Sequence, residues 1–260
     1  MIRWDPADYA DQSAAQLSWA KELLQRLKPA GTEAILDIGC GDGKITAVIA
    51  AAVPNGFVLG VDSSPEMIAH AVATHRAPNL QFRRADAQSI ELDRVFDVAF
   101  SNACLHWVDD WQGVFNGVAK CLRPGGRLFV SCGGKGNADQ VLHAVKRVGA
   151  SEAWRDYFRD FEFAWHFRDN RTADRLLRHA GFVPDRVELV PKDMTHDTPA
   201  GLAGWLRTTW MPYTHQVPED RREAFVADVL ADYLAERPPD AAGRTHVNMV
   251  RLEIEATCQV

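Results

Sequence analysis

The chain has 260 residues, of which 47% are hydrophobic, 25% charged and 9% aromatic. This is the composition of a folded globular protein, so it excludes disordered and collagen-like classes, and a chain of this length needs no disulfide or metal for stability. Acidic residues outnumber basic ones, 35 to 29, which gives a net charge of −6. Because dedicated nucleic-acid-binding proteins usually carry a basic face, we expect no nucleic-acid partner.

The cysteines and the apolar runs indicate where the protein works. The five cysteines, at positions 40, 104, 121, 132 and 258, never adopt Cys-x-x-Cys spacing, which indicates reduced thiols and no zinc site. The longest apolar run, residues 47–53, is far shorter than the roughly 20 residues that span a bilayer, and the N-terminus shows no signal peptide. We therefore expect a cytoplasmic protein without a metal or a membrane partner, of undetermined oligomeric state.

The predicted elements begin with a helix. Residues 8–28 repeat apolar side chains at helical spacing and stop at Pro29 and Gly31, which predicts an amphipathic helix. From Ala34 onward, short apolar runs alternate with turns and helical stretches. These runs predict strands at residues 34–38, 57–61, 80–83, 96–101 and 127–132. Strands alternating with helices are typical of a mostly parallel sheet that is covered on both faces.

The connecting segments add further boundaries. Ser63-Ser64-Pro65-Glu66 supplies an N-cap followed by proline, which predicts a helix from there to about Arg76. Arg123-Pro124-Gly125-Gly126 is predicted to end a helix and to turn the chain into the strand at residue 127. The remaining elements are a helix, a weak strand and a final strand, at residues 172–180, 187–190 and 246–256. The sheet therefore has seven predicted strands.

Residues 191–243 fit no βαβ repeat, since they hold a stretch rich in Trp and Pro and a long charged helix from about Pro218 to Glu236. We predict a single domain whose core spans about residues 30–190 and 244–260. Its helical cap comprises residues 1–29, about 133–168 and 191–243. We expect the cap to cover the carboxyl edge of the sheet, where ligands bind in open α/β folds.

The turn after the first predicted strand, Asp37-Ile38-Gly39-Cys40-Gly41-Asp42-Gly43-Lys44, carries the main chemical signal. Glycines between a strand and a helix let the backbone pass close to a ligand. The Gly-x-Gly-x-Gly spacing differs from the Gly-x-Gly-x-x-Gly of dinucleotide-binding enzymes. Asp37 would repel a pyrophosphate and suits a cationic group. The turn therefore predicts a nucleotide-like cofactor other than a dinucleotide.

The next two predicted strands also end in carboxylates. Asp62 follows the second strand, where it can accept hydrogen bonds from both hydroxyls of a ribose. Asp86 and Ala87 follow the third strand, where a carboxylate and a backbone amide can contact an adenine edge. Together with the glycine turn, these strand ends predict a cofactor that contains adenosine.

In this order, the motifs LDIGCGDGKIT, GVDSS, RADAQ, FSNACLHW and LRPGGRL resemble those of class I S-adenosylmethionine-dependent methyltransferases. The resemblance covers about residues 30–190 and the last strand. It implies a Rossmann-like α/β fold with a seven-stranded, mostly parallel, doubly wound sheet, an antiparallel last strand and a helical cap. It also implies S-adenosylmethionine as the cofactor, with the glycines at its methionine part, Asp62 at the ribose, and Asp86 and Ala87 at the adenine. The full set of expected cofactor-binding residues is Asp37, Gly39, Cys40, Gly41, Gly43, Asp62, Ser63, Asp86, Ala87, Ser101 and Asn102.

The flanking segments resemble most closely the small-molecule carboxyl methyltransferases that act on trans-aconitate and on juvenile hormone acid. The similarity lies in Tyr9 and Gln16, in the Leu105–Val108 run, and in the late segment rich in Trp and Arg. It implies O-methylation of a small carboxylic acid, with Gln16 orienting the acid. The other residues expected to bind substrate are Tyr9, Trp107, Arg207 and Trp210.

Methyl transfer is an in-line displacement, so the protein mainly has to align the reactants and exclude water. A carboxylate is already ionised at pH 7, whereas a phenol or an amine usually benefits from a base. We predict that His106 and Trp107, just after the fourth strand, face the substrate and act with Gln16 in catalysis. Each has an alternative role: His106 in bonding backbone, Trp107 in packing, Gln16 as a surface amide. Arg207 either pairs with a second substrate carboxylate or is a solvated helix charge.

Several alternatives stay open beside this prediction. Cys40 and Cys104 fit small packing residues better than nucleophiles, and Asp109-Asp110 fits a helix N-cap better than half a metal site. The competing functions are a phenol, amine or carbon methyltransferase, a non-catalytic S-adenosylmethionine-binding protein, and an NAD-linked oxidoreductase that the glycine spacing disfavours. A nucleic-acid methyltransferase is disfavoured because Ser101–Cys104 replaces the expected Asn/Asp-Pro-Pro-aromatic run.

Overall fold

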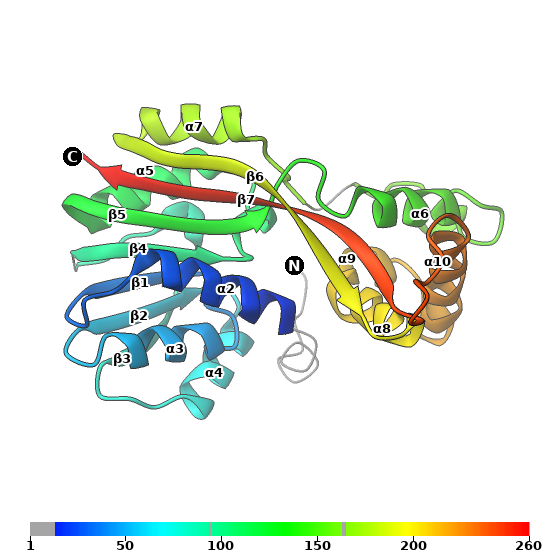
Figure 1. Ribbon diagram of the computed structural model, residues 1–260, viewed down its shortest axis with the longest axis horizontal. Coiled ribbons are helices and arrows are strands. Elements are labelled where there is room, and N and C mark those ends of the chain that lie inside the picture. The colour runs from blue at the N-terminus through cyan, green and yellow to red at the C-terminus, as the bar shows by residue number, and fades with distance from the viewer. Residues whose placement is uncertain (1–13, 94, 163–164, 260) are drawn as a thin grey trace. The chain divides into compact units, whose positions relative to one another are not determined.

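The computed structural model describes residues 14–93, 95–162 and 165–259 (Figure 1). Within these ranges, residues 14–17 are described by their backbone alone. The described residues group into two compact units. The sheet unit contains residues up to Lys135, Trp165–Val190 and the chain from Arg251 onward. The helical unit contains residues 136–162 and Pro191–Val250. The chain therefore passes between the units several times.

The described residues of the sheet unit form a seven-stranded sheet in the order β3-β2-β1-β4-β5-β7-β6. Neighbours from β3 to β5 pair in parallel, and β7 pairs antiparallel with β5. The strands are β1 (Ala34–Ile38), β2 (Phe57–Asp62), β3 (Leu80–Arg84), β4 (Phe96–Asn102), β5 (Leu122–Gly133), β6 (Phe182–His196) and β7 (Thr245–Cys258). This sheet confirms the predicted fold class. Its order reverses between β1 and β4, the point where open α/β sheets form a ligand crevice.

Helices cover both faces of the sheet, which explains why its central strands read as nearly continuous apolar runs. On one face, Leu36, Ala99 and Val130 share a core cluster with α5 (Trp111–Cys121) and α7 (Asn170–His179). On the other face, Ile35 and Phe100 share a cluster with α2 (Ala14–Leu27) and α3 (Lys44–Ala52). A further helix, α4 (Pro65–Thr74), packs against β2 and β3 (Figure 1).

Two helix starts confirm the capping residues predicted from the sequence. The Ser64 side chain accepts a hydrogen bond from the Met67 amide at 3.2 Å, and Pro65 occupies the first position of α4. The Asp110 side chain accepts from the Gly113 amide at 2.9 Å and caps α5. Each cap satisfies an amide that the first turn of a helix leaves without an intrahelical partner.

The N-terminal helix was predicted for residues 8–28, of which residues 8–13 lie outside the described residues. Its described part, α2, runs from Ala14 to Leu27 and belongs to the sheet unit. The physical reason is its apolar face, because Leu23 and Leu27 are buried against the sheet with Phe129 of β5. Arg26 adds ion pairs to Glu253 and Glu255 of β7. Residues 165–168, also predicted for the cap, likewise belong to the sheet unit.

Three strands extend beyond their predicted bounds by more than one residue at an end, whereas β2, β3 and β4 each end one residue later than predicted. β5 begins at Leu122, and a register shift between Phe96 and Val98 of β4 accommodates the Pro-Gly-Gly segment inside the strand. β6 covers Phe182–His196 instead of residues 187–190, and β7 covers Thr245–Cys258 instead of 246–256. β6 lies at the edge of the sheet and carries many exposed polar residues. Such a strand lacks the apolar run by which buried strands are recognised.

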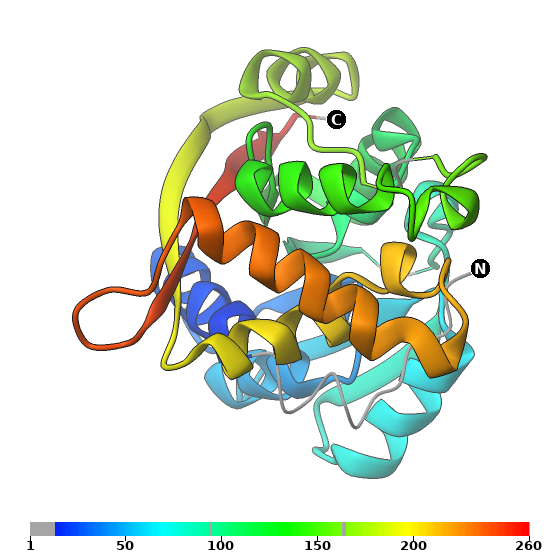
Figure 2. The ribbon, with the colours of Figure 1, turned by 90° about the vertical axis from the view of Figure 1, so that its right-hand side faces the viewer.

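The helical unit consists of helices packed around aromatic side chains. In Figure 2, α10 runs between α6 and α8, in agreement with their contacts. Phe225 of α10 stacks on Phe158 with ring centroids 5.2 Å apart, and Trp154 donates a hydrogen bond to Asp228 at 2.7 Å. The helices are α6 (Asp139–Gly149), α8 (Pro199–Thr209), α9 (Met211–Thr214) and α10 (Arg222–Glu236).

The described helices include none that is both long and apolar enough to cross a membrane. All five cysteines are free thiols. In the described part of the chain, no group of three or more His, Cys, Asp or Glu side chains is arranged to hold a metal ion.

Candidate functional site

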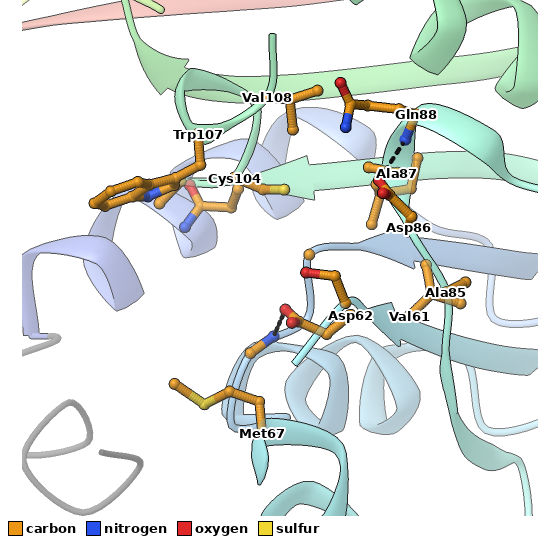
Figure 3. Close-up of a pocket in the computed structure, with 16 residues that line it drawn as sticks. Val61, Asp62, Met67, Ala85, Asp86, Ala87, Gln88, Cys104, Trp107 and Val108 are labelled. Carbon is orange, nitrogen blue, oxygen red and sulfur yellow. Dashed lines mark hydrogen bonds between the residues drawn. The ribbon is translucent and has the colours of Figure 1, made fainter. Parts of the chain in front are cut away.

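A pocket of the sheet unit lies at the carboxyl ends of β1 to β4 (Figure 3). In Figure 3, Trp107 lies on one side of the space, Asp86, Ala87 and Gln88 lie on the opposite side, and Asp62 lies between them. The lining residues are Ile38, Gly39, Gly41, Val61, Asp62, Ser63, Met67, Ala85, Asp86, Ala87, Gln88, Asn102, Ala103, Cys104, Trp107 and Val108. The sequence motifs at the ends of these strands thus line one common pocket.

The glycine turn after β1 leaves no room for a side chain on Gly39 or on Gly43. The Gly39 amide donates to the Val61 carbonyl at 2.8 Å, and its φ of +72° lies in the left-handed region. A Cβ on Gly39 would lie 2.2 Å from Sγ of Cys104, and one on Gly43 would lie 2.7 Å from the Phe82 ring. Backbone atoms therefore form this side of the pocket, as expected for a turn that a ligand approaches closely.

Asp62 ends β2 with its carboxylate held on both oxygens. Oδ2 accepts from the Gly41 amide at 3.0 Å, and Oδ1 accepts from the Ser64 amide at 2.9 Å. Burial raises the pKa of Asp62, and the amide hydrogen bonds act in the opposite direction. A carboxylate offers about four acceptor sites, so each oxygen keeps acceptor capacity for a ligand hydroxyl.

Asp37 lies beneath the glycine turn and is not among the lining residues. Its side chain is buried and accepts a hydrogen bond from the Thr46 hydroxyl at 2.7 Å. Burial raises the pKa of Asp37 to about 7, against the lowering effect of the Thr46 hydrogen bond. The hydrogen bond from Thr46 to Asp37 therefore connects the start of α3 to β1. Because Asp37 does not line the pocket, its charge would act on a bound cation only across the glycine turn.

The opposite side of the pocket is formed by the end of β3 and the start of α5. Asp86 accepts from the Gln88 amide at 2.9 Å, while the Gln88 side chain accepts from the Asp110 amide at 3.0 Å. Ala87 and Val108 add apolar surface to the same region. Gln88 and Val108 were not predicted as site residues, although both lie within or beside the motifs of the third and fourth strands.

His106 is held by backbone on the β4 side. Its Nδ1 accepts a hydrogen bond from the Gly133 amide at 3.3 Å, which matches the second of its two predicted roles. Burial, assisted by the charge of Arg251, lowers the pKa of His106 to about 3. The imidazole is therefore neutral at physiological pH and is a poor acceptor of protons.

Trp107 belongs to an aromatic cluster that residues 165–167 complete. Its ring lies edge-on to Trp165 at 5.3 Å, and Trp165 stacks on Phe167 at 5.9 Å. The His166 amide donates to the His106 carbonyl at 2.8 Å, which fixes this segment to the loop after β4. No local pattern in the sequence could have revealed this packing, because the two segments are distant along the chain.

The remaining predicted site residues lie around the pocket or away from it. Gly43 and the buried Cys40 and Ser101 support the turn and β4 without lining the pocket, and the Ser101 hydroxyl donates to the Ile38 carbonyl at 2.9 Å. Burial raises the pKa of both Cys40 and Cys104, so these thiols are poor nucleophiles.

The substrate residues predicted outside the core motifs are distributed over the chain. Tyr9 lies outside the described residues, and Gln16 lies in α2 with only its backbone described. Arg207 and Trp210 belong to the helical unit. There Arg207 pairs with Glu223 at 3.5 Å, and the buried Trp210 packs edge-on to Trp205 at 5.6 Å.

Comparisons with known proteins agree with the motifs. A methyltransferase domain family matches residues 35–126. The chain is 35% identical over 236 residues to a trans-aconitate 2-methyltransferase of Acidovorax ebreus (strain TPSY), with 87% of each chain covered. It is 30% identical over 266 residues to that of Methylobacterium radiotolerans, with 98% of each covered. The fold is similar to a methyltransferase structure from Bacillus halodurans, with a TM-score of 0.62 at 15% identity, covering 94% of this chain and 100% of that one.

Proposed function

Because the chain belongs to the class I S-adenosylmethionine-dependent methyltransferases, we propose that it methylates a carboxylate oxygen of a small-molecule acid. The observation that carries this proposal is the state of His106, whose low pKa and backbone hydrogen bond make it unsuited to act as a base. A carboxylate acceptor needs no base, whereas a phenol or an amine usually benefits from one. The trans-aconitate 2-methyltransferases among the relatives support the same acceptor class.

The pocket fits the cofactor. The backbone of Gly39 and Gly41 lines the side of the pocket that is open to the methionine part, and the two oxygens of Asp62 have acceptor capacity for the two ribose hydroxyls. Ala87 and Val108 offer apolar contact to an adenine ring, beside the polar groups of Asp86 and Gln88. When bound, S-adenosylmethionine supplies an electrophilic methyl group on a positively charged sulfur.

The residues of this chain contribute by orientation and by exclusion of water. Trp107 walls the pocket and is held by Trp165, so its ring is fixed before the acceptor arrives. A fixed wall aligns the acceptor oxygen and keeps water away from the methyl group, which is most of what an in-line displacement requires. Gln16, Tyr9, Arg207 and Trp210 remain our proposed contacts for the acid.

We propose further that the protein works in the cytoplasm on a free small molecule. The five free thiols are in keeping with a reducing compartment. The acidic net charge of −6 is in keeping with an acceptor other than nucleic acid.

The test combines binding with a transfer assay. Calorimetry should detect binding of S-adenosylhomocysteine but not of NAD. Labelled methyl transfer is then measured over matched sets of a carboxylic acid, its primary amide, and a phenol or amine of similar size. We expect label on acids that alkali releases, as an ester requires. Alkali-stable label on phenols or amines would contradict the carboxylate acceptor, and cofactor binding without transfer would favour a non-catalytic role.

The variant His106→Gln sharpens this test. An amide side chain retains a hydrogen-bond acceptor but has no basic nitrogen. We expect transfer to acids to change less than about threefold, since no proton is removed from a carboxylate at pH 7. A loss of about 100-fold or more, the range of general-base catalysis, would instead indicate that His106 removes a proton from the acceptor.

A further inference from the structure

Arg251 is a buried cation in the sheet unit and has no part in the mechanism proposed above. It lies on β7 opposite Gly133 of β5, and only 3% of its surface is exposed. Its Nη2 donates to the Ser131 carbonyl at 2.6 Å, and its Nε donates to the Ser131 hydroxyl at 3.2 Å. The ring of Trp19, from α2, lies 4.8 Å from the guanidinium carbon. Because a guanidinium does not lose its proton in proteins, this side chain places a permanent positive charge here.

Two hydrogen bonds connect this charge to the pocket. The Ser131 carbonyl that accepts from Arg251 also accepts from the Ala103 amide at 2.8 Å. Ala103 lines the pocket and has a φ of +58°. The Gly133 amide, which belongs to the residue opposite Arg251 in the sheet, donates to His106. The charge of Arg251 helps to lower the pKa of His106. The guanidinium therefore lies behind the carboxyl ends of β4 and β5, close to the wall of the pocket.

The helix that covers Arg251 also carries a proposed acceptor contact. Trp19 of α2 packs on the guanidinium, and Gln16 lies three residues before Trp19 in the same helix. Contacts from β5 and from α2 thus fix the position of Arg251 near the carboxyl ends of β4 and β5.

We propose that Arg251 is the specificity-determining residue that makes the pocket prefer an anionic acceptor over a neutral one. This inference rests on the proposed function. A charge inside a protein is felt more strongly than one in water, so a nearby guanidinium favours a bound carboxylate without touching it. An uncharged amide of the same shape gains little from the same field.

The reaction itself predicts how this preference should appear in the kinetics. As the carboxylate oxygen forms its bond to the methyl carbon, the carbon–sulfur bond breaks and sulfur keeps the electron pair. The negative acceptor and the positive sulfonium thereby become a neutral ester and a neutral thioether. A fixed cation stabilises the bound carboxylate more than it stabilises the transition state, in which that charge is partly lost. Removing Arg251 should therefore raise KM for the acid and leave kcat unchanged or slightly higher.

The test compares Arg251→Gln, Arg251→Lys and Arg127→Gln. Gln keeps a donor for Ser131 but has no charge, and Lys keeps the charge. Arg127 is the matched control, since it also donates to a carbonyl, that of Leu27 at 3.1 Å, and lies 5.1 Å from an aromatic ring, that of Phe129. Arg127 stands at the start of the segment of β5 that pairs with β7, whereas Arg251 lies opposite the end of that segment.

Five quantities are measured for each protein. They are the Kd of S-adenosylhomocysteine, KM and kcat for an acid, and the Kd of that acid and the Kd of its primary amide in the S-adenosylhomocysteine complex. For Arg251→Gln we expect KM to rise about 10- to 30-fold and the preference for acid over amide to fall by a similar factor. This is the size of effect expected when a unit charge several ångströms from the carboxylate is removed, at an effective dielectric constant near 20. We expect kcat and the Kd of S-adenosylhomocysteine to change less than about threefold. Arg251→Lys should retain most of the preference, and Arg127→Gln all of it.

An equal loss of affinity for acid and amide in Arg251→Gln, or a fall in kcat with unchanged KM, would overturn the proposal and leave Arg251 a structural residue. If Arg251→Gln does not fold, a folded Arg251→Lys protein that lacks the preference would overturn it equally. Absence of ester formation by the natural protein would refute the proposed function alone. The inference fails independently if the natural protein binds the acid no more tightly than the amide.

Discussion

The two sides of the pocket are constructed in different ways. On the side of β1 to β3, contacts form within and between short motifs, as where the Gly41 and Ser64 amides hold Asp62. On the side of β4 and β5, residues 103–107 are held by distant partners. Ser131 holds Ala103, Gly133 holds His106, and Trp165 packs on Trp107.

The two sides should therefore respond differently to substitution. The glycine turn depends on backbone conformations and close approaches that a single added carbon prevents. The loop after β4 depends on packing and hydrogen bonds that can be weakened in steps. Changes near β1 should abolish cofactor binding, whereas changes near β4 should lower transfer gradually and leave cofactor binding in place.

The largest effect is expected from Gly39→Ala. The new Cβ would lie 2.2 Å from Sγ of Cys104, at a φ of +72°. The left-handed backbone costs about 1–2 kcal/mol for a residue with a Cβ, and overpacking adds about 1–3 kcal/mol. We expect the affinity for S-adenosylhomocysteine, measured by calorimetry, to fall by a factor of about 100 or more.

Gly125→Ala is the matched control for this variant. Gly125 has a similar φ of +77°, but a Cβ there would have no atom within 4 Å. It should lower the melting temperature through backbone strain and leave the affinity for S-adenosylhomocysteine unchanged. Normal cofactor binding by the Gly39→Ala protein would show that the turn tolerates a side chain, and the contrast between the two sides would then be wrong.

Asp62→Ala should have the next largest effect. The change removes the acceptor of the Gly41 and Ser64 amides and the proposed acceptor of the ribose hydroxyls. Losing hydrogen bonds to a charged group costs about 1.5–3 kcal/mol, which corresponds to binding that is about 10- to 100-fold weaker. Asp174→Ala, which removes an exposed ion pair with Arg178 on α7, serves as the control. Equal affinity of the two variants for S-adenosylhomocysteine would exclude Asp62 as the ribose contact.

The same contrast explains how much of the fold could be predicted. The strand β1 was predicted with its observed bounds because a short run in which four of five residues are apolar precedes a glycine turn. The capping roles of Ser64 and Asp110 also depend on neighbouring residues alone. The place of α2 could not be predicted in this way, since Leu23 and Leu27 would be buried equally well against a cap or a sheet.

The candidate site divides in the same way. Gly39, Asp62 and Asp86, which were predicted to contact the cofactor, line the pocket, and each stands at the end of a recognisable strand. Trp165 and Arg251 were missed, because each acts through a partner that is far away in the sequence. Spacing within a motif gives no information about such contacts.

Trp165→Phe tests the side that depends on distant partners. Trp165 is buried and supports Trp107 at a centroid distance of 5.3 Å. Because an aromatic pair contributes about 0.5–1.5 kcal/mol, we expect transfer to acids to fall about 2- to 10-fold, with less than a twofold change in the Kd of S-adenosylhomocysteine. Phe115→Leu disturbs a comparable pair, with Trp111 at 5.9 Å, and should leave transfer unchanged. Equal losses in both variants would mean that reduced stability, and not the wall of the pocket, lowers the rate.

The smallest effect at neutral pH, and the most specific one, concerns His106. Its pKa is about 3 in the folded protein, below the ordinary value of 6.5 that it regains on unfolding. Between these values the unfolded chain binds more protons than the folded one, so acidification from pH 7 toward pH 3 must favour unfolding. In His106→Gln this contribution is absent, and the free energy of unfolding in urea should fall less between pH 7 and pH 5 than it does in the natural protein. His179→Gln, which alters an exposed histidine of α7, should leave the decline as it is. An unchanged decline in His106→Gln would mean that His106 takes up its proton in the folded state, and it would then be available as a base after all.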